Sequence, residues 1–500
     1  MSGIGDRVGR WARTWAINTL NTAVYTLSLG EVTLHEGKYS RLTRRWSNWN
    51  RTFAARPGRY VRPTSEAEIC EAVGAAERVR VVGGGHTFNA SPLTEHTLIS
   101  LDGYNKVLAV DRDRKVVRAQ AGIRLRDLMP QLEAHGLDLP VLGSTNAQSL
   151  AGLVATDLHG TGRDHGFLSE QVLSLRVVNA RGEAHTVRRG DAAFHAILGG
   201  LGCCGVVTEV ELLCVDAYNL KKSIQIVRRD WAEENIERLL QEHDHLSFYY
   251  LGGVDAENIR MNVWDQTSQA PQRSYPWRDM YLELVDMLFT GYVIGLAPTM
   301  KAANLTAWLG LAFFKLTMNG HKTVYPSSVG FRRKLFYRHD EMEYGVPFER
   351  YRECLAEIRA MLRRKKYVSI IEVRFTPERS QGLLGPGVGR RTCFIELAPG
   401  LSGDPTEIFR EGEQIFRRYG GQLHLGKATW ATPENLREMF ADRLVQFQKV
   451  RREQDGAGKF DNDFARALFG PAAALGCSSS PLKNPSSSRS STAGEADFSA

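Results

Sequence analysis

Three consecutive glycines mark the first stretch of the chain that could bind a ligand. They lie in Val82-Gly83-Gly84-Gly85-His86-Thr87, directly after a short run rich in β-branched residues. Because glycine has no side chain, this backbone can approach a ligand closely and point several N–H groups at a phosphate. We therefore predict a pyrophosphate site here, with a plain tight turn as the alternative interpretation. The spacing differs from the G-x-G-x-x-G of Rossmann dinucleotide sites.

Two further glycine-rich segments follow in the same region. Small and hydroxyl residues are frequent in Leu142-Gly143-Ser144 and in the stretch 151–162, and their short side chains leave room for a flat aromatic ring. Residues 198–210 form a glycine-rich turn that runs into β-branched residues. Three such segments in one domain favour a large cofactor over three unrelated turns.

The elements that must position these segments alternate as short strands and helices from about residue 57 to 215. A capping box at Ser65 opens one helix, and a strand follows at 79–82. From about residue 216, helical patterns such as 231–243 alternate with isolated strands such as 369–375. We therefore expect an α+β protein with a second sheet-and-helix domain, and a C-terminal stretch that returns to the first domain.

Composition excludes some partners and leaves others open. The formal charge of +8 is concentrated in residues 1–56, which hold nine Lys and Arg against three acids. No folded face interleaves basic and aromatic residues, so we expect no nucleic-acid partner. A basic arm could instead contact an anionic membrane or act as a mitochondrial address. Seven cysteines without a CxxC pair favour reduced thiols in an intracellular compartment, and we expect no metal site.

The apolar stretch 287–300 has 14 uncharged residues, fewer than the roughly 20 needed to span a bilayer. We expect a buried or surface-dipping segment, and we regard 1–45 and 280–316 as the regions that could contact a membrane peripherally.

Taken in order, several motifs resemble the FAD-linked oxidases of the vanillyl-alcohol oxidase superfamily, and within it the sugar-1,4-lactone oxidases and alditol oxidases. The resemblance covers about residues 46–470. It rests on the segments 46–51, 60–65, 83–89, 101–108, 121–137, 153–162, 341–347, 371–374 and 424–427.

The resemblance implies a PCMH-type FAD-binding domain of two α+β subdomains closed by an α+β cap domain. It also implies that His86, after the glycine triplet, bonds covalently to the flavin, with noncovalent FAD as the alternative. The expected parts are a basic extension at 1–45, the FAD-binding domain at 46–216, the cap at 217–417, a segment completing the active site at 418–475, and a disordered Ser-rich tail at 476–500. The expected cofactor contacts are Val82, Gly83, Gly84, Gly85, His86, Thr87, Gly143, Ser144, Gly152, Thr156, His159, Gly160, Val206 and Val207.

Four polar residues are the candidates for chemistry. Glu372 and Arg374 are two apart in a strand-like stretch, so both side chains point to one face. His424 and Lys427 are three apart, and a helical or tight turn would place them together. The resemblance implies oxidation of a carbinol carbon, where fixed cationic groups stabilise the developing alkoxide. A salt bridge between Glu372 and Arg374 is the structural alternative.

The resemblance therefore implies oxidation of a sugar lactone or polyol, with molecular oxygen as acceptor and Gly143 leaving room for it. Leu425 departs from the usual His-Trp-Gly/Ala-Lys pattern, which leaves the substrate open and removes a packing surface expected beside the flavin. Two alternatives stay open: a membrane-associated enzyme that oxidises a lipid-linked sugar, and an inactive flavin-binding redox partner.

Overall fold

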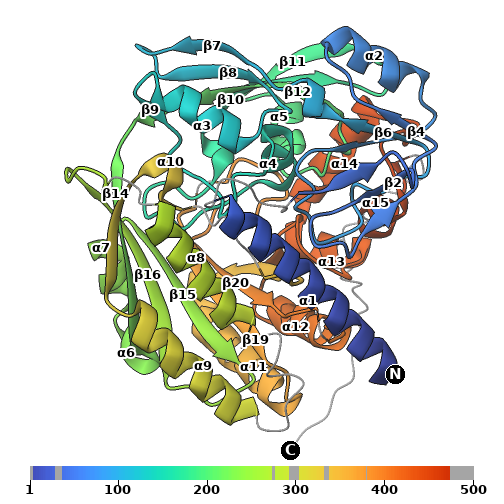
Figure 1. Ribbon diagram of the computed structural model, residues 1–500. Helices are drawn as coiled ribbons and strands as arrows, with labels where there is room; N and C mark the ends of the chain where they lie inside the picture. The colour runs from blue at the N-terminus through green and yellow to red at the C-terminus, as the bar shows by residue number, and fades with distance from the viewer. Residues whose placement is uncertain are drawn as a thin grey trace, which may run out of the picture.

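The protein is described by a computed structural model that covers residues 4–28, 36–272, 276–291, 303–331, 337–378, 380–401 and 403–472. Figure 1 shows its arrangement, with layers of helices on several separate sheets. This architecture confirms the expected α+β class. The Ser-rich tail at 476–500 and most of the apolar stretch 287–300 lie outside the described residues.

A small parallel sheet carries the glycine triplet. Its strand order is β4-β6-β5, and helix α2 connects β4 to β5. Only half of the capping box predicted at Ser65 is present: the Glu68 amide donates to the Ser65 hydroxyl at 3.3 Å, but the Glu68 carboxylate accepts from the Thr64 amide, at 2.7 Å, and not from Ser65. Ile69, Ala72 and Val73 on one face of α2 are buried, so capping and burial together fix the helix. The bounds are β4 Arg59–Val61, α2 Glu66–Ala75, β5 Val79–Val82 and β6 Thr97–Ser100, with a small sheet of β1 Lys38–Ser40, β2 Arg45–Ser47 and β3 Ala54–Ala55 nearby.

An antiparallel sheet of order β11-β10-β12-β8-β7 forms the second subdomain. Its buried face packs on α3, α4 and α5 in a core that includes Leu128, Leu153 and Phe194. The bounds are β7 Val107–Asp111, β8 Val116–Gln120, α3 Leu125–Glu133, β9 Leu137–Asp138, α4 Leu150–Thr156, β10 Val172–Val178, β11 Ala184–Arg188, α5 Ala192–Ile197, β12 Val206–Leu213 and β13 Val215–Asp216.

The cap is built on an eight-stranded antiparallel sheet of order β17-β14-β16-β15-β19-β20-β18-β21. The helix expected at 231–243 is two helices, α6 and α7, that meet at Asn235. The bounds are β14 Asn219–Arg228, α6 Arg229–Glu234, α7 Ile236–Glu242, β15 His245–Gly252, β16 Asn258–Thr267, β17 His321–Pro326, α10 Ser327–Gly330, β18 Met342–Pro347, α11 Tyr351–Arg364, β19 Ser369–Thr376, β20 Thr392–Ala398, α12 Thr406–Arg418 and β21 Gln422–Leu423.

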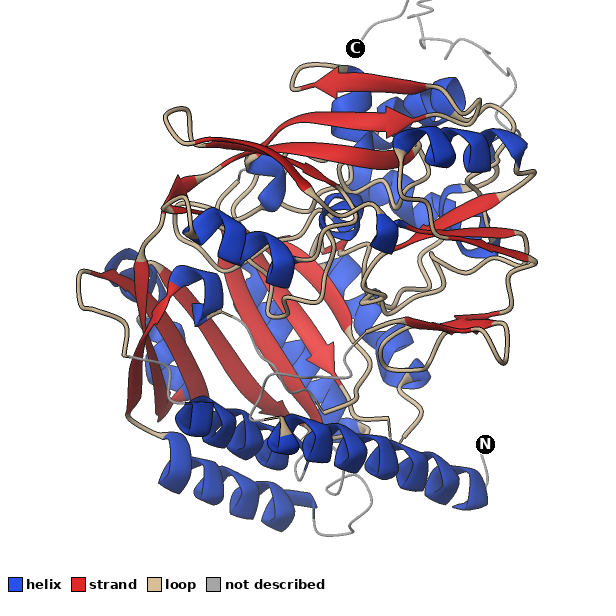
Figure 2. Ribbon diagram, turned by 45° about the horizontal axis from the view of Figure 1, so that its top comes forward, coloured by secondary structure: helices blue, strands red, loops and turns tan. Residues whose placement is uncertain are grey.

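Three helices from distant parts of the sequence lie together at one end of the cap sheet: α1 Ile4–Leu27, α8 Pro276–Thr290 and α9 Ala303–Met318. Figure 2 shows them side by side. Tyr25, Met280 and Phe314 of these helices share an apolar core with Ile224 of β14. Helix α1 is thus part of the cap layer, whereas the sequence suggested a separate basic extension. None of the helices in the described segments is long and apolar enough to cross a bilayer.

The end of the chain returns to the first subdomain. The Val79 amide donates to the Lys459 carbonyl at 2.9 Å, and Phe460 packs in the same core as Ile69. The bounds are α13 Pro433–Phe440, α14 Asp442–Gln454 and α15 Asp463–Phe469. The six cysteines within the described residues form no disulfide.

Candidate active site

Close packing at Gly83 and Gly84 and the backbone conformation of Gly85 favour glycine throughout the triplet after β5. A Cβ atom on Gly83 would lie 2.0 Å from Oγ of Ser149, and one on Gly84 would lie 2.4 Å from the Ala147 carbonyl oxygen. Gly85 has φ +69°, a left-handed conformation that favours glycine. The carbonyls of Gly84 and Gly85 accept hydrogen bonds from Gly37 and Trp49. The packing therefore holds the loop rigid.

One cavity runs along this loop, and its lining supports the predicted cofactor site. Thr87 Oγ1 and Gln148 Oε1 are buried there and have no hydrogen-bond partner within the described part of the chain. Buried polar atoms normally have partners, so these two atoms fit a bound polar group. Together with the loop they fit FAD, which would be held along the triplet. The predicted residues that line the cavity are Val82, Gly83, Gly84, Gly85, His86, Thr87, Gly143, Ser144, Gly152, Thr156 and His159.

Three predicted cofactor residues lie elsewhere. Gly160 is outside the lining, and its amide donates to the Gly166 carbonyl at 2.8 Å. Val206 and Val207 of β12 are buried with their side chains in two apolar cores. Leu425 is also buried in the main core, so its side chain packs inside the protein and not beside the cavity.

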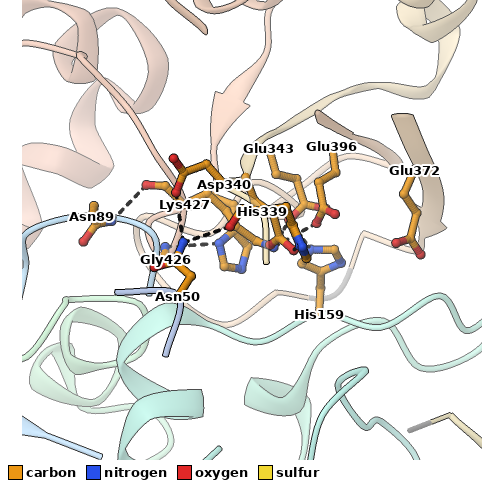
Figure 3. A network of polar contacts seen from close by, with 12 residues as sticks. Asn50, Asn89, His159, His339, Asp340, Glu343, Glu372, Glu396, Gly426 and Lys427 are labelled. Carbon is orange, nitrogen blue, oxygen red and sulfur yellow. Dashed lines mark hydrogen bonds and ion pairs between the residues drawn. The ribbon is translucent and has the colours of Figure 1, made fainter. Parts of the chain in front are cut away.

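All four predicted catalytic residues line the same cavity: Glu372, Arg374, His424 and Lys427. The register of the cap sheet places further polar residues beside them. Glu343 of β18 is opposite Glu396 of β20, which is opposite Glu372 of β19. Because directly opposed residues share one face of a sheet, the three carboxylates form a row (Figure 3).

Two cations bind this row. Nη2 of Arg374 lies 2.5 Å from Oε1 of Glu343 and 2.9 Å from Oε2 of Glu396. Nζ of Lys427 lies 2.8 Å from Oε2 of Glu396 and also contacts Glu341. The predicted Glu372–Arg374 pair is longer, at 3.8 Å. Glu396 is therefore the carboxylate that lies within 3 Å of both cations, since Glu343 is 3.8 Å from Lys427.

Two histidines and an asparagine fix the ends of the cluster. His159 stacks on Phe394 with ring centroids 3.6 Å apart, and its Nε2 lies 3.2 Å from Glu343. His339 lies 2.6 Å from Glu341. The side chain of Asn89 donates to the Leu425 and Lys427 carbonyls at 2.7 and 2.9 Å. The loop that carries Lys427 is thus tied to the loop after the glycine triplet.

The balance of charge differs among the carboxylates. Burial opposes ionisation of Glu343, yet Arg374, His159 and Lys427 hold its pKa well below the usual range. Burial likewise opposes ionisation of Glu341, but Lys427 and His339 lower its pKa to about 2. For Glu396, burial and the charge of Glu341 outweigh both cations and raise the pKa to about 7. Glu396 can therefore exchange a proton near neutral pH.

His424 and Lys427 each keep one protonation state near neutral pH. Burial lowers the pKa of His424 to about 3, so this imidazole is neutral. Its Nδ1 accepts a hydrogen bond from the Gly426 amide at 3.1 Å. Burial would lower the pKa of Lys427, but Glu341, Glu396 and Glu343 raise it above the ordinary value. Lys427 therefore stays a cation.

His159, Glu343 and His424 bring potential metal-binding atoms within 4.8 Å of one another. Arg374 already lies beside Glu343, so a cationic group of the protein occupies the place next to this carboxylate. The arrangement is better suited to holding a negative oxygen between Arg374 and Lys427 than to binding a cation.

Sequence reasoning missed Glu341, Glu343 and Glu396 as site residues. A signal was present in Glu341-Met342-Glu343, which alternates charged and apolar residues as Glu372-Val373-Arg374 does. Glu396 is a single acid in an apolar strand. Only the register shows which residues it faces.

Comparisons with known proteins identify two matching families. Residues 210–468 match the family described as D-arabinono-1,4-lactone oxidase, and residues 57–188 match the FAD binding domain family. An L-gulono-1,4-lactone dehydrogenase of Mycobacterium tuberculosis is 32% identical over 436 residues, covering 85% of this chain and 99% of the relative. L-Gulonolactone oxidase of Bos taurus is 29% identical over 444 residues, covering 85% and 98%.

Among solved structures, a solvent-stable cholesterol oxidase superimposes with a TM-score of 0.69 at 17% identity, covering 87% of this chain and 98% of that one. This likeness concerns the fold.

Proposed function

The chain belongs to the family of FAD-dependent aldonolactone oxidases and dehydrogenases, and we propose that it oxidises a CH–OH group of a sugar lactone or polyol, with oxygen as the acceptor. The observation that carries this proposal is the pair of cations, Arg374 and Lys427, that meet at Glu396 in the cavity beside the glycine triplet. Bound FAD would supply a hydride acceptor.

The protein's own groups account for the other half of the reaction. When the substrate hydroxyl takes its place at the two cations, Arg374 and Lys427 donate hydrogen bonds to its oxygen and stabilise the alkoxide. The ionised Glu396 carboxylate accepts the hydroxyl proton. Glu343 is a positioning residue, because it holds Arg374 and contacts His159.

We assign the covalent flavin link to His86. Its imidazole stacks on Trp49, with centroids 5.6 Å apart and planes at 15°. Trp49 in turn lies edge-on to His339. This packing would fix the ring in one orientation beside the cavity, as a covalent attachment point requires.

A peripheral contact with an anionic lipid surface is proposed for helix α9. Its outer face exposes apolar side chains, with Trp308 at 64% and Leu316 at 87% exposure, and Lys315 is its sole charged residue. An apolar helix face with nearby positive charge is suited to the interface of a bilayer. Residues 1–56 supply an excess of Lys and Arg. The other exposed apolar residues of α9 are Leu305, Leu309 and Phe313.

The deciding experiment is anaerobic reduction of the purified yellow enzyme by a panel of aldono-1,4-lactones and alditols. Flavin bleaching by at least one lactone, followed by hydrogen peroxide formation on aeration, is expected. If no lactone or alditol bleaches the flavin, the proposed reaction is wrong.

A further inference from the structure

The cavity is longer than its reactive end. The row of residues that begins at Glu396 continues through Glu372 of β19 and Tyr249 of β15 to Arg260 of β16. All four residues line the cavity. With neighbouring strands 4.7–4.9 Å apart, three strand intervals separate Glu396 from Arg260 by roughly 14 Å. A lactone ring held at Arg374 and Lys427 would leave the Arg260 end empty.

Apolar side chains from four elements line this far end, which we call the annex. They come from both the cap sheet and the helices that cover it, so the annex is enclosed by the α8–α9 layer. The residues are Leu251 of β15, Ile370 of β19, Phe289 of α8, and Leu311 and Phe314 of α9.

Arg260 is the buried polar group of the annex that could recognise a ligand. Its Nε donates to Asn262 at 2.8 Å, and its Nη1 pairs with Asp286 of α8. The guanidinium lies over the rings of Tyr249 and Phe314, 4.9 Å from each centroid. Nη2 of Arg260 donates a hydrogen bond to none of the described residues. Because Asp286 pairs with the guanidinium, the annex offers the N–H donor of an ion pair in otherwise apolar surroundings.

The distribution of charge in the cavity also favours an apolar ligand in the annex. Four carboxyl groups, on Glu341, Glu343, Glu372 and Glu396, face two cations at the reactive end. An anionic substituent would find both of these cations already paired with carboxylates, and in the annex Arg260 is already paired with Asp286. An apolar chain would remove the annex side chains from water and needs no free cation.

We propose, on the basis of the function above, that the annex binds an apolar acyl or alkyl chain carried by the sugar lactone. The oxygen that joins chain and sugar accepts a hydrogen bond from Nη2 of Arg260. The substrate class is therefore an O-acylated or O-alkylated sugar lactone, and the annex decides affinity while Arg374 and Lys427 act on the ring.

The test compares L-gulono-1,4-lactone with its 6-O-octanoyl ester, below the micelle concentration, in anaerobic stopped-flow reduction of the flavin. The ester is expected to half-saturate flavin reduction at a concentration at least tenfold lower than the free lactone does. The limiting rate of reduction should be similar for the two substrates. Leu311→Trp fills the annex and should abolish this advantage while free lactone is oxidised as before. Leu316→Trp, on the exposed face of the same helix, is the matched control and should keep the advantage.

Leu311→Ala provides a second variant if the larger side chain prevents folding. It removes contacts with the chain and should reduce the advantage of the ester several-fold, with flavin content unchanged.

Four outcomes would overturn the inference. In the first, free and acylated lactone half-saturate flavin reduction at the same concentration in the unaltered enzyme. In the second, Leu311→Trp and Leu316→Trp reduce the advantage of the ester equally. A third is preference for a glycosyl lactone of similar length, which would make the annex a sugar site. The fourth is fast reoxidation by decylquinone that Leu311→Trp abolishes, which would make it an acceptor site. Failure of every lactone to reduce the flavin would instead contradict the proposed function.

Discussion

The carboxylate of Glu396 lies 2.8 Å from the ammonium of Lys427, yet its pKa is raised to about 7. Burial and the nearby charge of Glu341 produce this combination, since Glu341 takes the same ammonium as its partner. A carboxyl that changes protonation state near neutral pH, in contact with two fixed cations, is suited to accept a proton from a substrate hydroxyl.

The first prediction concerns pH. Because the raised pKa keeps Glu396 protonated below about pH 7, the base is present only above it, and the limiting rate of flavin reduction should rise through that pH. Glu396→Gln should lower the limiting rate of flavin reduction about a hundredfold, since a positioned base contributes 10²–10⁴-fold. The same variant should also lose the step in rate near pH 7. Glu372→Gln is the control and should keep the step. A step that survives in Glu396→Gln would assign it to another group.

The second prediction concerns the two cations. Lys427→Met and Arg374→Lys should each slow flavin reduction about a hundredfold, because removal or displacement of one preorganised donor commonly costs 10²–10³ in rate. Stopped-flow measurements should show normal reoxidation in both variants. Arg363→Ala, on an exposed part of α11, is the control for the loss of a positive charge. Unaltered reduction rates in both variants would show that the alkoxide is held elsewhere.

Local patterns predicted part of this site and could not predict the rest. Gly83–Gly85 were identifiable from a short motif whose chemistry is local, and Arg374 and Lys427 from the motifs that carry the family resemblance. Glu396 was not, because its partners come from β18 and β19 through strand register. The basic composition of residues 1–45 likewise predicts an extension, whereas Tyr25 of α1 is buried in one core with residues of α8 and α9. Tertiary packing, which periodicity does not encode, decides such positions.

The third prediction concerns His86. The mass of the denatured protein should exceed the sequence mass by one FAD, and the yellow colour should stay with acid-precipitated protein. His86→Ala should keep the fold and bind flavin noncovalently, with slower turnover. Trp49→Phe, which weakens the stack on His86, should leave a fraction of the protein unmodified. An unmodified mass with free FAD in the supernatant would contradict covalency and leave flavin binding intact.

The fourth prediction concerns helix α9. The protein should sediment with vesicles that contain phosphatidylglycerol, and less with phosphatidylcholine alone. Trp308→Ser combined with Leu316→Ser should weaken binding about tenfold or more, since two large apolar side chains are lost from the contact. Leu213→Ser, on an exposed position of β12, should have no effect. If the double variant and Leu213→Ser sedimented equally with the vesicles, α9 would be excluded as the membrane contact.

The last prediction concerns the electron acceptor and rests on Gly143. This residue lines the cavity, and its φ lies outside the left-handed region, so backbone geometry does not require glycine there. A Cβ atom would lie 2.6 Å from Oε1 of Gln148, a flexible side-chain end that can move, and 3.3 Å from Cδ1 of Leu158. Gly143→Ala should therefore fold while placing a methyl group where oxygen would approach the flavin. Mixing photoreduced enzyme with air-saturated buffer should give fast reoxidation that slows at least tenfold in Gly143→Ala, with reduction by substrate unchanged. Gly152→Ala, at an exposed position of α4 with a Cβ contact of 3.4 Å, is the control for loss of a cavity glycine. Slow reoxidation of the unaltered enzyme, with fast transfer to a quinone or cytochrome c, would instead make the protein a dehydrogenase, the activity in the name of its mycobacterial relative.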